Sequence, residues 1–130
     1  MASIHKEIVI EARPEHVWSA VRDVGALHTR LVPGFVVDTR LEDGARVVTF
    51  GNGAVARERI IDLDEQRRRL VWSVIGAPFT HHNGSLQIFA EGERQSRAVW
   101  IADLSPDELV GRIGSMMDQG LSIMKRTLEQ

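Results

Sequence analysis

The chain has 130 residues, of which 43% are hydrophobic and 26% charged, a composition that indicates one globular domain and excludes a mainly disordered chain. Sixteen basic and 18 acidic residues give a net charge of −2, so the electrostatic footprint of a nucleic-acid-binding protein is missing. The absence of cysteine excludes disulfides and thiolate metal sites and favours a cytoplasmic location, and no apolar stretch is long enough to span a membrane.

The first third of the chain predicts one strand and two short helices. Ile4, Ile8 and Ile10 alternate with polar residues, which predicts a strand with one dry face over residues 4–11. Residues 13–21 predict a short helix, because a proline stands at its first position and its apolar residues share one side. A second helical turn is expected over residues 26–31, closed by the proline and glycine at 33 and 34.

The middle of the chain predicts an antiparallel meander of six strands, because extended stretches alternate with turn residues. The expected strands cover residues 35–41, 46–50, 54–63, 69–75, 80–90 and 96–103. Three consecutive arginines at 67–69 are assigned to a turn, since acidic residues precede them and an apolar strand follows. No helices alternate with these strands, which argues against a parallel sheet.

The C-terminal segment predicts one long amphipathic helix. Its apolar residues recur at spacings of three and four: Leu109, Ile113, Met116, Met117, Leu121, Met124 and Leu128. Ser105 and Glu108 flank a proline in the pattern of a capping box, so the helix is expected to begin there and to run for about 35 Å. The predicted fold class is therefore α+β, a seven-stranded curved antiparallel sheet wrapped around a long C-terminal helix.

This arrangement favours a cavity. A helix is only about 10 Å wide and cannot fill the whole concave face of a strongly curved sheet. The side chains expected to fill the remainder are flexible methionines, while the helix also contains glycines at 111, 114 and 120 that have no side chain. Each helical glycine costs roughly 1 kcal/mol relative to alanine, which indicates that close approach, a kink or free volume is gained in return.

Four segments carry a resemblance to a known family: IVIEARPEHVWSAVRDV, RERIIDLDEQRRRLVWSVIGAP, HHNGSLQIF and SRAVWIADLSPDELVGRIGSMMDQGLSIMKRTLE. The chain resembles, over essentially its whole length as a single domain, the polyketide cyclase/dehydrase and lipid-transport family of the START-like, Bet v 1-like (SRPBCC) superfamily. The resemblance implies the helix-grip fold and a hydrophobic ligand cavity between the sheet and the last helix. These motifs mark architecture and say little about chemistry.

Two residues are candidates for acid–base chemistry in such a cavity. Glu58 shares a strand face with Ala56 and Ile60. If this face points inward, burial would raise the pKa of Glu58 and make it a proton donor or acceptor. The alternative is a structural ion pair of Glu58 with Arg46 or Arg59. His82 lies on the more apolar face of its strand and could act as a base or bind a ligand carbonyl; the alternative is a histidine of the cavity wall.

The expected ligand-binding residues are aromatic, flexible or small: Trp72, Trp100, Phe50, Met116, Met117 and Gly120. For each of them plain core packing is the alternative. No metal site is expected, because His81 and His82 point to opposite faces and no carboxylate cluster completes a ligand set. No cofactor is expected either, since phosphate-binding and dinucleotide-binding glycine patterns are missing, as is a serine-nucleophile motif.

Three functions remain open. The first is a binding protein for a small hydrophobic or aromatic molecule, lipid-like or polyketide-like. The second is an enzyme of the cyclase or aromatase type that uses His82 and Glu58 for aldol closure and dehydration in the same cavity. The third is an interaction module or homodimer, in which Val99 and Ile101 place apolar area on the convex face of the sheet.

Overall fold

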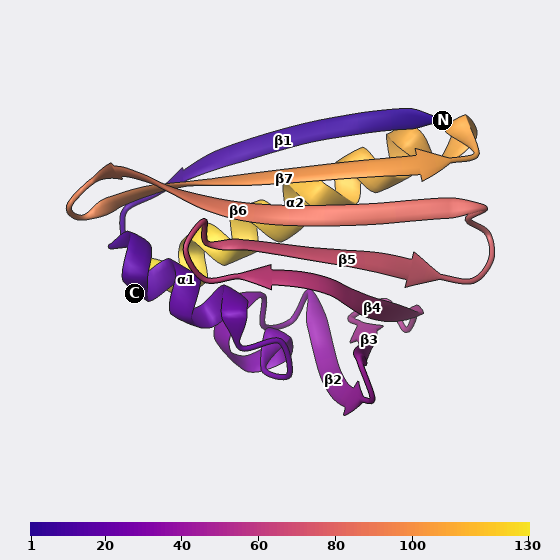
Figure 1. Ribbon diagram of the computed structural model, residues 1–130, viewed down its shortest axis with the longest axis horizontal. Helices are drawn as coiled ribbons and strands as arrows, with labels where there is room; N and C mark the ends of the chain where they lie inside the picture. The colour runs from indigo at the N-terminus through magenta and orange to yellow at the C-terminus, as the bar shows by residue number, and fades with distance from the viewer.

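The computed structural model describes residues 1–130 and contains one seven-stranded antiparallel sheet and one long helix (Figure 1). The strands are β1 (Ala2–Ile10), β2 (Val36–Glu42), β3 (Ala45–Phe50), β4 (Val55–Asp64), β5 (Arg69–Ile75), β6 (His81–Gly92) and β7 (Gln95–Ser105). The helical elements are α1 (Pro14–Arg22), the π-helical turn η1 (Leu27–Leu31), the 3₁₀ turn η2 (Asp107–Leu109) and α2 (Val110–Leu128). The predicted helix-grip fold is confirmed, and every predicted strand is present within two residues of its expected ends.

The sheet order is β1-β7-β6-β5-β4-β3-β2, so the six strands after η1 form a meander and β1 closes the sheet against β7. Register shifts interrupt three of the strand pairs, near Val37, Ile61 and Glu91. Such bulges bend the strand that carries them and increase its twist. The sheet therefore curls, and β2 and β3 stand at a large angle to β6 and β7 (Figure 1).

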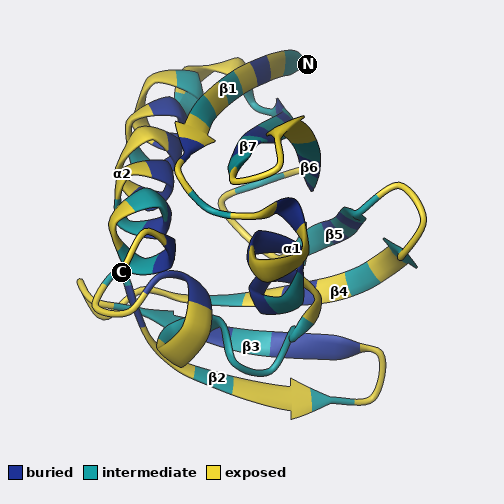
Figure 2. Cartoon of the chain, turned by 90° about the vertical axis from the view of Figure 1, so that its left-hand side faces the viewer, coloured by how far each residue is buried: buried dark blue, intermediate teal, exposed yellow.

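The long helix α2 covers only part of the concave face. It packs mainly against β1, with lesser contacts to β7 and η1. Two polar contacts fix it there: Lys6 Nζ donates to Asp118 Oδ2 at 3.1 Å, and Lys125 Nζ donates to the Val9 carbonyl oxygen at 2.9 Å. The buried side of α2 faces the sheet, while β2 and β3 curl round on the far side of the interior (Figure 2). The concave face of β3 to β6 is thus left uncovered by α2, and of these strands β6 is contacted by the short helix α1.

The two short helices lie at one end of the interior (Figure 2). Val17, Trp18 and Val21 of α1 are buried in the main core cluster. Trp18 Nε1 donates to Glu65 Oε1 at 2.7 Å, and Arg22 forms a bidentate pair with the same carboxylate, whose pKa these hydrogen bonds hold below its usual range. Glu65 therefore ties α1 to the turn between β4 and β5.

The predicted capping box is wrong. Ser105 is the last residue of β7: it pairs with His81, and its carbonyl oxygen accepts from the Thr80 amide. Neither η2 nor α2 has a side-chain cap, and α2 begins only at Val110. Its 19 residues span about 28 Å rather than the expected 35 Å. The serine is held in the sheet because strand pairing already satisfies its backbone groups.

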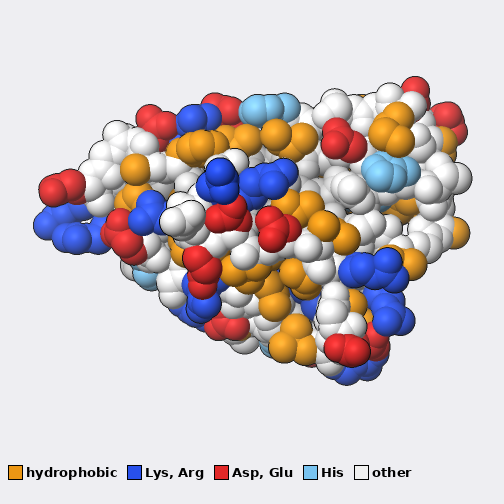
Figure 3. Space-filling model, in the orientation of Figure 1, with side chains coloured by type: hydrophobic (Ala, Val, Ile, Leu, Met, Phe, Trp, Pro, Cys, Tyr) orange, Lys and Arg blue, Asp and Glu red, His pale blue; other side chains and the backbone are white.

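The convex face of the sheet mixes apolar and charged side chains (Figure 3). Val99, which was expected to expose apolar area here, is only 6% exposed and lies between Glu7 of β1 and Gln87 of β6, whereas Ile101 is half-buried. Arg97 lies over the Phe89 ring at 4.8 Å and covers part of that face. The expected homodimer stays a prediction.

Candidate functional site

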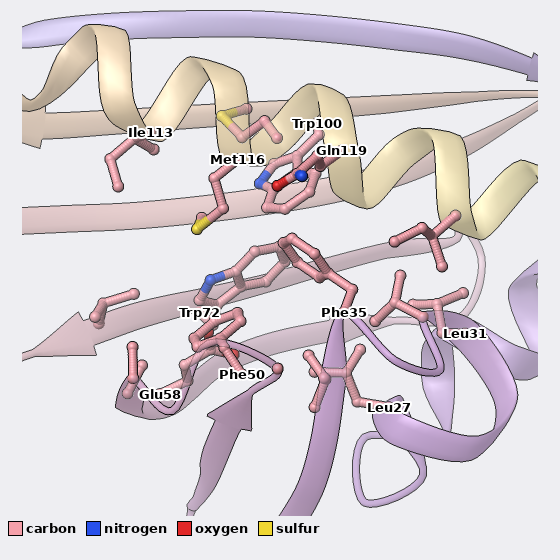
Figure 4. Close-up of a pocket in the computed structure, with 18 of the residues that line it drawn as sticks. Leu27, Leu31, Phe35, Phe50, Glu58, Trp72, Trp100, Ile113, Met116 and Gln119 are labelled. Atoms are coloured by element: carbon pink, nitrogen blue, oxygen red, sulfur yellow. The ribbon is translucent and has the colours of Figure 1, made fainter.

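A cavity of about 750 Å³ lies between the concave face of the sheet and α2 (Figure 4). Of the 35 residues that line it, 23 are hydrophobic. They come from α1, from strands β2 to β7, from the segment around η1, from the loop before β6, and from α2. The volume exists because α2 packs toward β1 and does not pack closely against β3 to β6.

Aromatic rings form the centre of the cavity wall. Trp72 and Trp100 lie with their ring centroids 6.2 Å apart, and Phe35 meets Phe50 edge to face at 5.6 Å. Figure 4 shows Phe35, Phe50 and Trp72 grouped opposite the helix that carries Met116. Such a wall offers flat apolar faces on which a ring-shaped guest can stack.

Two glycines give these tryptophans their positions. Gly84 pairs with Trp72 across the strands, and a Cβ built on Gly84 would lie 2.6 Å from the Trp72 indole ring. A Cβ on Gly120 would lie 2.9 Å from the Trp100 ring. Real Cβ atoms do not come this close to a ring, so each glycine makes room for one indole.

One buried ion pair stands in the cavity wall. Arg46 Nε donates to Glu58 Oε1 at 2.8 Å, and the two residues are 3% and 7% exposed. Arg46 also donates to the Val24 carbonyl oxygen at 3.3 Å and lies 5.7 Å from the Trp72 ring centroid, within cation–π range. Of the two partners considered for Glu58, the structure selects Arg46; Arg59 points to the other face.

His82 is buried in the wall without a hydrogen-bond partner. It is 7% exposed, and the Phe79 ring lies against it at a centroid distance of 4.4 Å, tilted by 51°. Its Nδ1 atom is inaccessible and makes no hydrogen bond. Burial, with a smaller contribution from His81, lowers the pKa of His82 to about 4, so the imidazole is neutral at physiological pH.

These polar residues lie in one row across the sheet. Arg46 pairs with Glu58, and Glu58 pairs with Val74. The pairing of β5 with β6 ends at Ser73 with Asn83, and its register continued by one residue sets Val74 opposite His82. Adjacent strands are about 4.8 Å apart, so on this register the Cα atoms of Glu58 and His82 lie about 10 Å apart, with the position of an apolar valine between them. The cavity wall therefore has the Arg46–Glu58 pair at one side and His82 at the other, with apolar side chains between them.

Most of the predicted site residues border this one cavity. Glu58, His82, Phe50, Trp72, Trp100, Met116 and Met117 all line it. Gly120 is not among the lining residues; it lies against the Trp100 ring, and its expected part in ligand binding stays a prediction. Whether the lining residues bind or react stays a prediction.

Sequence reasoning missed several lining residues, including Leu27, Phe35, Phe79 and Gln119. These residues lie in loops, in a helical turn or on the exposed side of α2, where alternation gives no signal. Arg46 was considered only as a possible ion-pair partner. Its place opposite Glu58 follows from the turn at Gly51 to Gly53, which sets the register of β3 and β4.

The described chain contains no group of three or more histidine, aspartate or glutamate side chains placed to hold a metal ion. His81 and His82 point to opposite faces of β6, as their alternation requires. No helix is both long enough and apolar enough to cross a membrane.

Comparison with known proteins gives one family. The family model described as polyketide cyclase / dehydrase and lipid transport matches residues 1–129. No curated protein matches the chain.

Solved structures share its fold. Protein XoxI from Bacillus cereus has a TM-score of 0.88 at 19% identity, covering 98% of this chain and 96% of that one. The di-domain ARO/CYC BexL from the BE-7585A biosynthetic pathway has a TM-score of 0.81 at 16% identity, covering 99% of this chain and 47% of that one. Norcoclaurine synthase from Thalictrum flavum, in complex with dopamine and hydroxybenzaldehyde, has a TM-score of 0.67 at 20% identity, covering 99% of this chain and 87% of that one.

Proposed function

Because the chain belongs to the polyketide cyclase/dehydrase and lipid-transport family, we propose that it binds a small hydrophobic or aromatic molecule in the cavity between the sheet and α2. The observation that carries this proposal is the cavity of about 750 Å³ with a predominantly hydrophobic lining. Ligand sites in proteins typically measure about 300 to 1,000 Å³ and combine an apolar wall with a few polar groups. The cytoplasmic location expected from the cysteine-free sequence is part of the same proposal.

The composition of the wall favours a flat guest. Trp72 and Phe50 present ring faces from the sheet, and Met116 adds an adaptable side chain from the helix. A planar molecule can stack on the rings without requiring new hydrogen bonds from the wall. We therefore expect aromatic or fused-ring compounds to bind better than flexible chains of equal area.

A cyclase-type or aromatase-type reaction is the second candidate, and one observation favours it. His82 is an uncharged imidazole within the cavity, where it could polarise a ketone. Two observations place it second. A histidine whose pKa is about 4 is a weak base at neutral pH, and Glu58 already accepts a hydrogen bond from Arg46. The proposed acid–base pair is thus separated and partly engaged.

The binding proposal is tested by blocking the cavity. Val74 lines it on β5, whereas Val71 on the same strand points to the convex face and serves as the matched control. Titration with the apolar fluorescent probe N-phenyl-1-naphthylamine should show binding to the wild type and to Val71→Trp. Val74→Trp should bind the probe at least about 10-fold more weakly. Absence of binding to the wild type, or equal affinity in both variants, would overturn the proposal.

The enzymatic alternative needs a separate measurement. A synthetic poly-β-ketone is incubated with the wild type, His82→Ala and Glu58→Ala, and cyclised products are quantified by mass spectrometry. Loss of wild-type turnover in His82→Ala, with N-phenyl-1-naphthylamine still bound, supports catalysis. Product formation at the uncatalysed rate in every sample contradicts it for this substrate.

A further inference from the structure

One buried side-chain atom, Nδ1 of the cavity-lining residue His82, is left without a hydrogen-bond partner. Neither ring nitrogen of His82 has a protein partner, and of the two only Nδ1 is fully sealed from solvent. At the other end of the polar row, Glu58 Oε1 accepts from Arg46, whereas Glu58 Oε2 makes no hydrogen bond within the chain and is not fully sealed. Buried polar residues normally have their polar atoms paired, so the two unpaired atoms that are not sealed, His82 Nε2 and Glu58 Oε2, are the ones with which a guest in the cavity can pair.

Resting on the function proposed above, we propose that His82 is a specificity-determining residue that selects uncharged ligands bearing a carbonyl-type oxygen. By strand spacing, the Cα atom of His82 lies about 10 Å across the sheet from that of Glu58, the partner of Arg46. The ligand class is a neutral, rigid ring system with an oxygen function at each end. The oxygen at one end accepts from His82, and a hydroxyl at the other donates to Glu58.

The role of donor follows from the position of the two ring nitrogens. A neutral imidazole carries one N–H and one lone pair. Buried N–H groups without a partner are rarer in proteins than under-satisfied acceptors, so the sealed Nδ1 is assigned the lone pair. The proton then resides on Nε2, the nitrogen that is not sealed. Nε2–H is a donor, and its natural partner is a carbonyl oxygen.

The preference for an uncharged guest follows from the charges of the wall. Glu58 compensates Arg46 within the cavity, and His82 is neutral. A carboxylate placed beside His82 would lose its hydration without meeting a free cation, which is costly in an apolar site. Arg112 and Arg126 also border the cavity, but both are exposed on α2, where solvent and salt screen their charge.

Three matched naphthalenes test this inference by isothermal titration calorimetry at pH 7.5. 6-Acetyl-2-naphthol has both oxygens, 6-ethyl-2-naphthol lacks the carbonyl, and 6-hydroxy-2-naphthoate carries a charge in its place. For the wild type we expect the acetyl compound to bind about 10-fold more tightly than either of the others. His82→Phe should abolish this preference but keep affinity for the ethyl compound, whereas His82→Gln, which retains an N–H donor, should restore most of it.

A control variant and a spectroscopic readout separate recognition from stability. His81→Phe changes the neighbouring histidine on the opposite face and should leave the preference intact. In the two-bond ¹H–¹⁵N spectrum of the wild type, the Nε2 resonance of His82 should indicate a protonated nitrogen and should shift with the acetyl compound more than with the ethyl compound.

The outcomes distinguish this inference from the binding proposal. If the ethyl and acetyl compounds bind the wild type equally, or if His82→Phe keeps the preference, His82 is not a specificity residue although the cavity still binds. If the naphthoate binds most tightly, the preference for uncharged guests is wrong. If no naphthalene and no N-phenyl-1-naphthylamine binds, both the inference and the proposed function fail.

Discussion

The buried pair of Arg46 and Glu58 makes a quantitative prediction about stability. Replacing Glu58 by leucine removes the only carboxylate that pairs with Arg46, whose side chain remains buried in the cavity wall. The guanidinium would then be an uncompensated charge with low solvent access. Replacing both residues, as in Arg46→Met with Glu58→Leu, removes the charge together with its partner.

The structure sets the expected sizes. Breaking a buried ion pair by removing one partner costs about 3 to 5 kcal/mol of unfolding free energy. We expect the lower end of this range for Glu58→Leu, about 3 kcal/mol, because Arg46 keeps its hydrogen bond to Val24 and its place over Trp72. The double variant should be within about 1 kcal/mol of the wild type, since apolar replacements of similar volume are often neutral.

Urea unfolding followed by circular dichroism measures these free energies. The double-mutant cycle is completed by Arg46→Met, which leaves Glu58 unpaired and should also destabilise the fold. The reasoning is refuted if Glu58→Leu loses less than about 1 kcal/mol, or if the two single losses simply add in the double variant.

Two other features give predictions of their own. Gly84→Ala should destabilise the protein by about 1 to 3 kcal/mol and change its tryptophan emission, because the new Cβ would overlap the Trp72 ring. Gly111→Ala is the control, because its Cβ would meet nothing within 4 Å, and it should be neutral or stabilising. Urea titrations of both variants measure these changes. The wild type should lose about 2 kcal/mol of unfolding free energy when the pH falls from 6.5 to 4. Folding lowers the pKa of His82 from 6.5 to about 4, so within this range only the unfolded chain binds the proton. The full shift corresponds to about 3 kcal/mol, which is reduced here for partial solvent access. Unfolding of His82→Phe across this pH range should lack that loss, and an equal loss in the variant would contradict the assignment.

The fold could be predicted from the sequence where periodicity is unambiguous. Alternation marked the strands, and three-and-four spacing marked α2. The start of α2 was missed because Ser105 satisfies a capping pattern and a strand register equally well, and strand pairing with His81 decides between them. Local sequence cannot weigh a long-range pairing against a cap.

The site was predictable only in part. Alternation placed His82 and Trp72 on the concave face, and hairpin register could have paired Arg46 with Glu58. Neither alternation nor hairpin register could reveal that Phe35 and Phe79, which precede strands, reach into the cavity. Their positions depend on how far β2 curls and on where α2 settles, which are properties of the assembled sheet.

The irregularity near Ile61 has a consequence for variation in chain length. It adds one residue to β4 between Ile60 and Asp62, so the alternation changes phase there, and Leu63 still packs against the core. An insertion in the turn after Asp64 would leave the cavity-facing half of β4 unchanged. Deletion of Ile61 would remove the bulge and leave Leu63 four positions after Glu58 in a regularly alternating strand, so both side chains would still point to the concave face. What the deletion would take away is the bend that the bulge gives to β4, so this single residue contributes to the curl of the sheet and not to the orientation of Leu63.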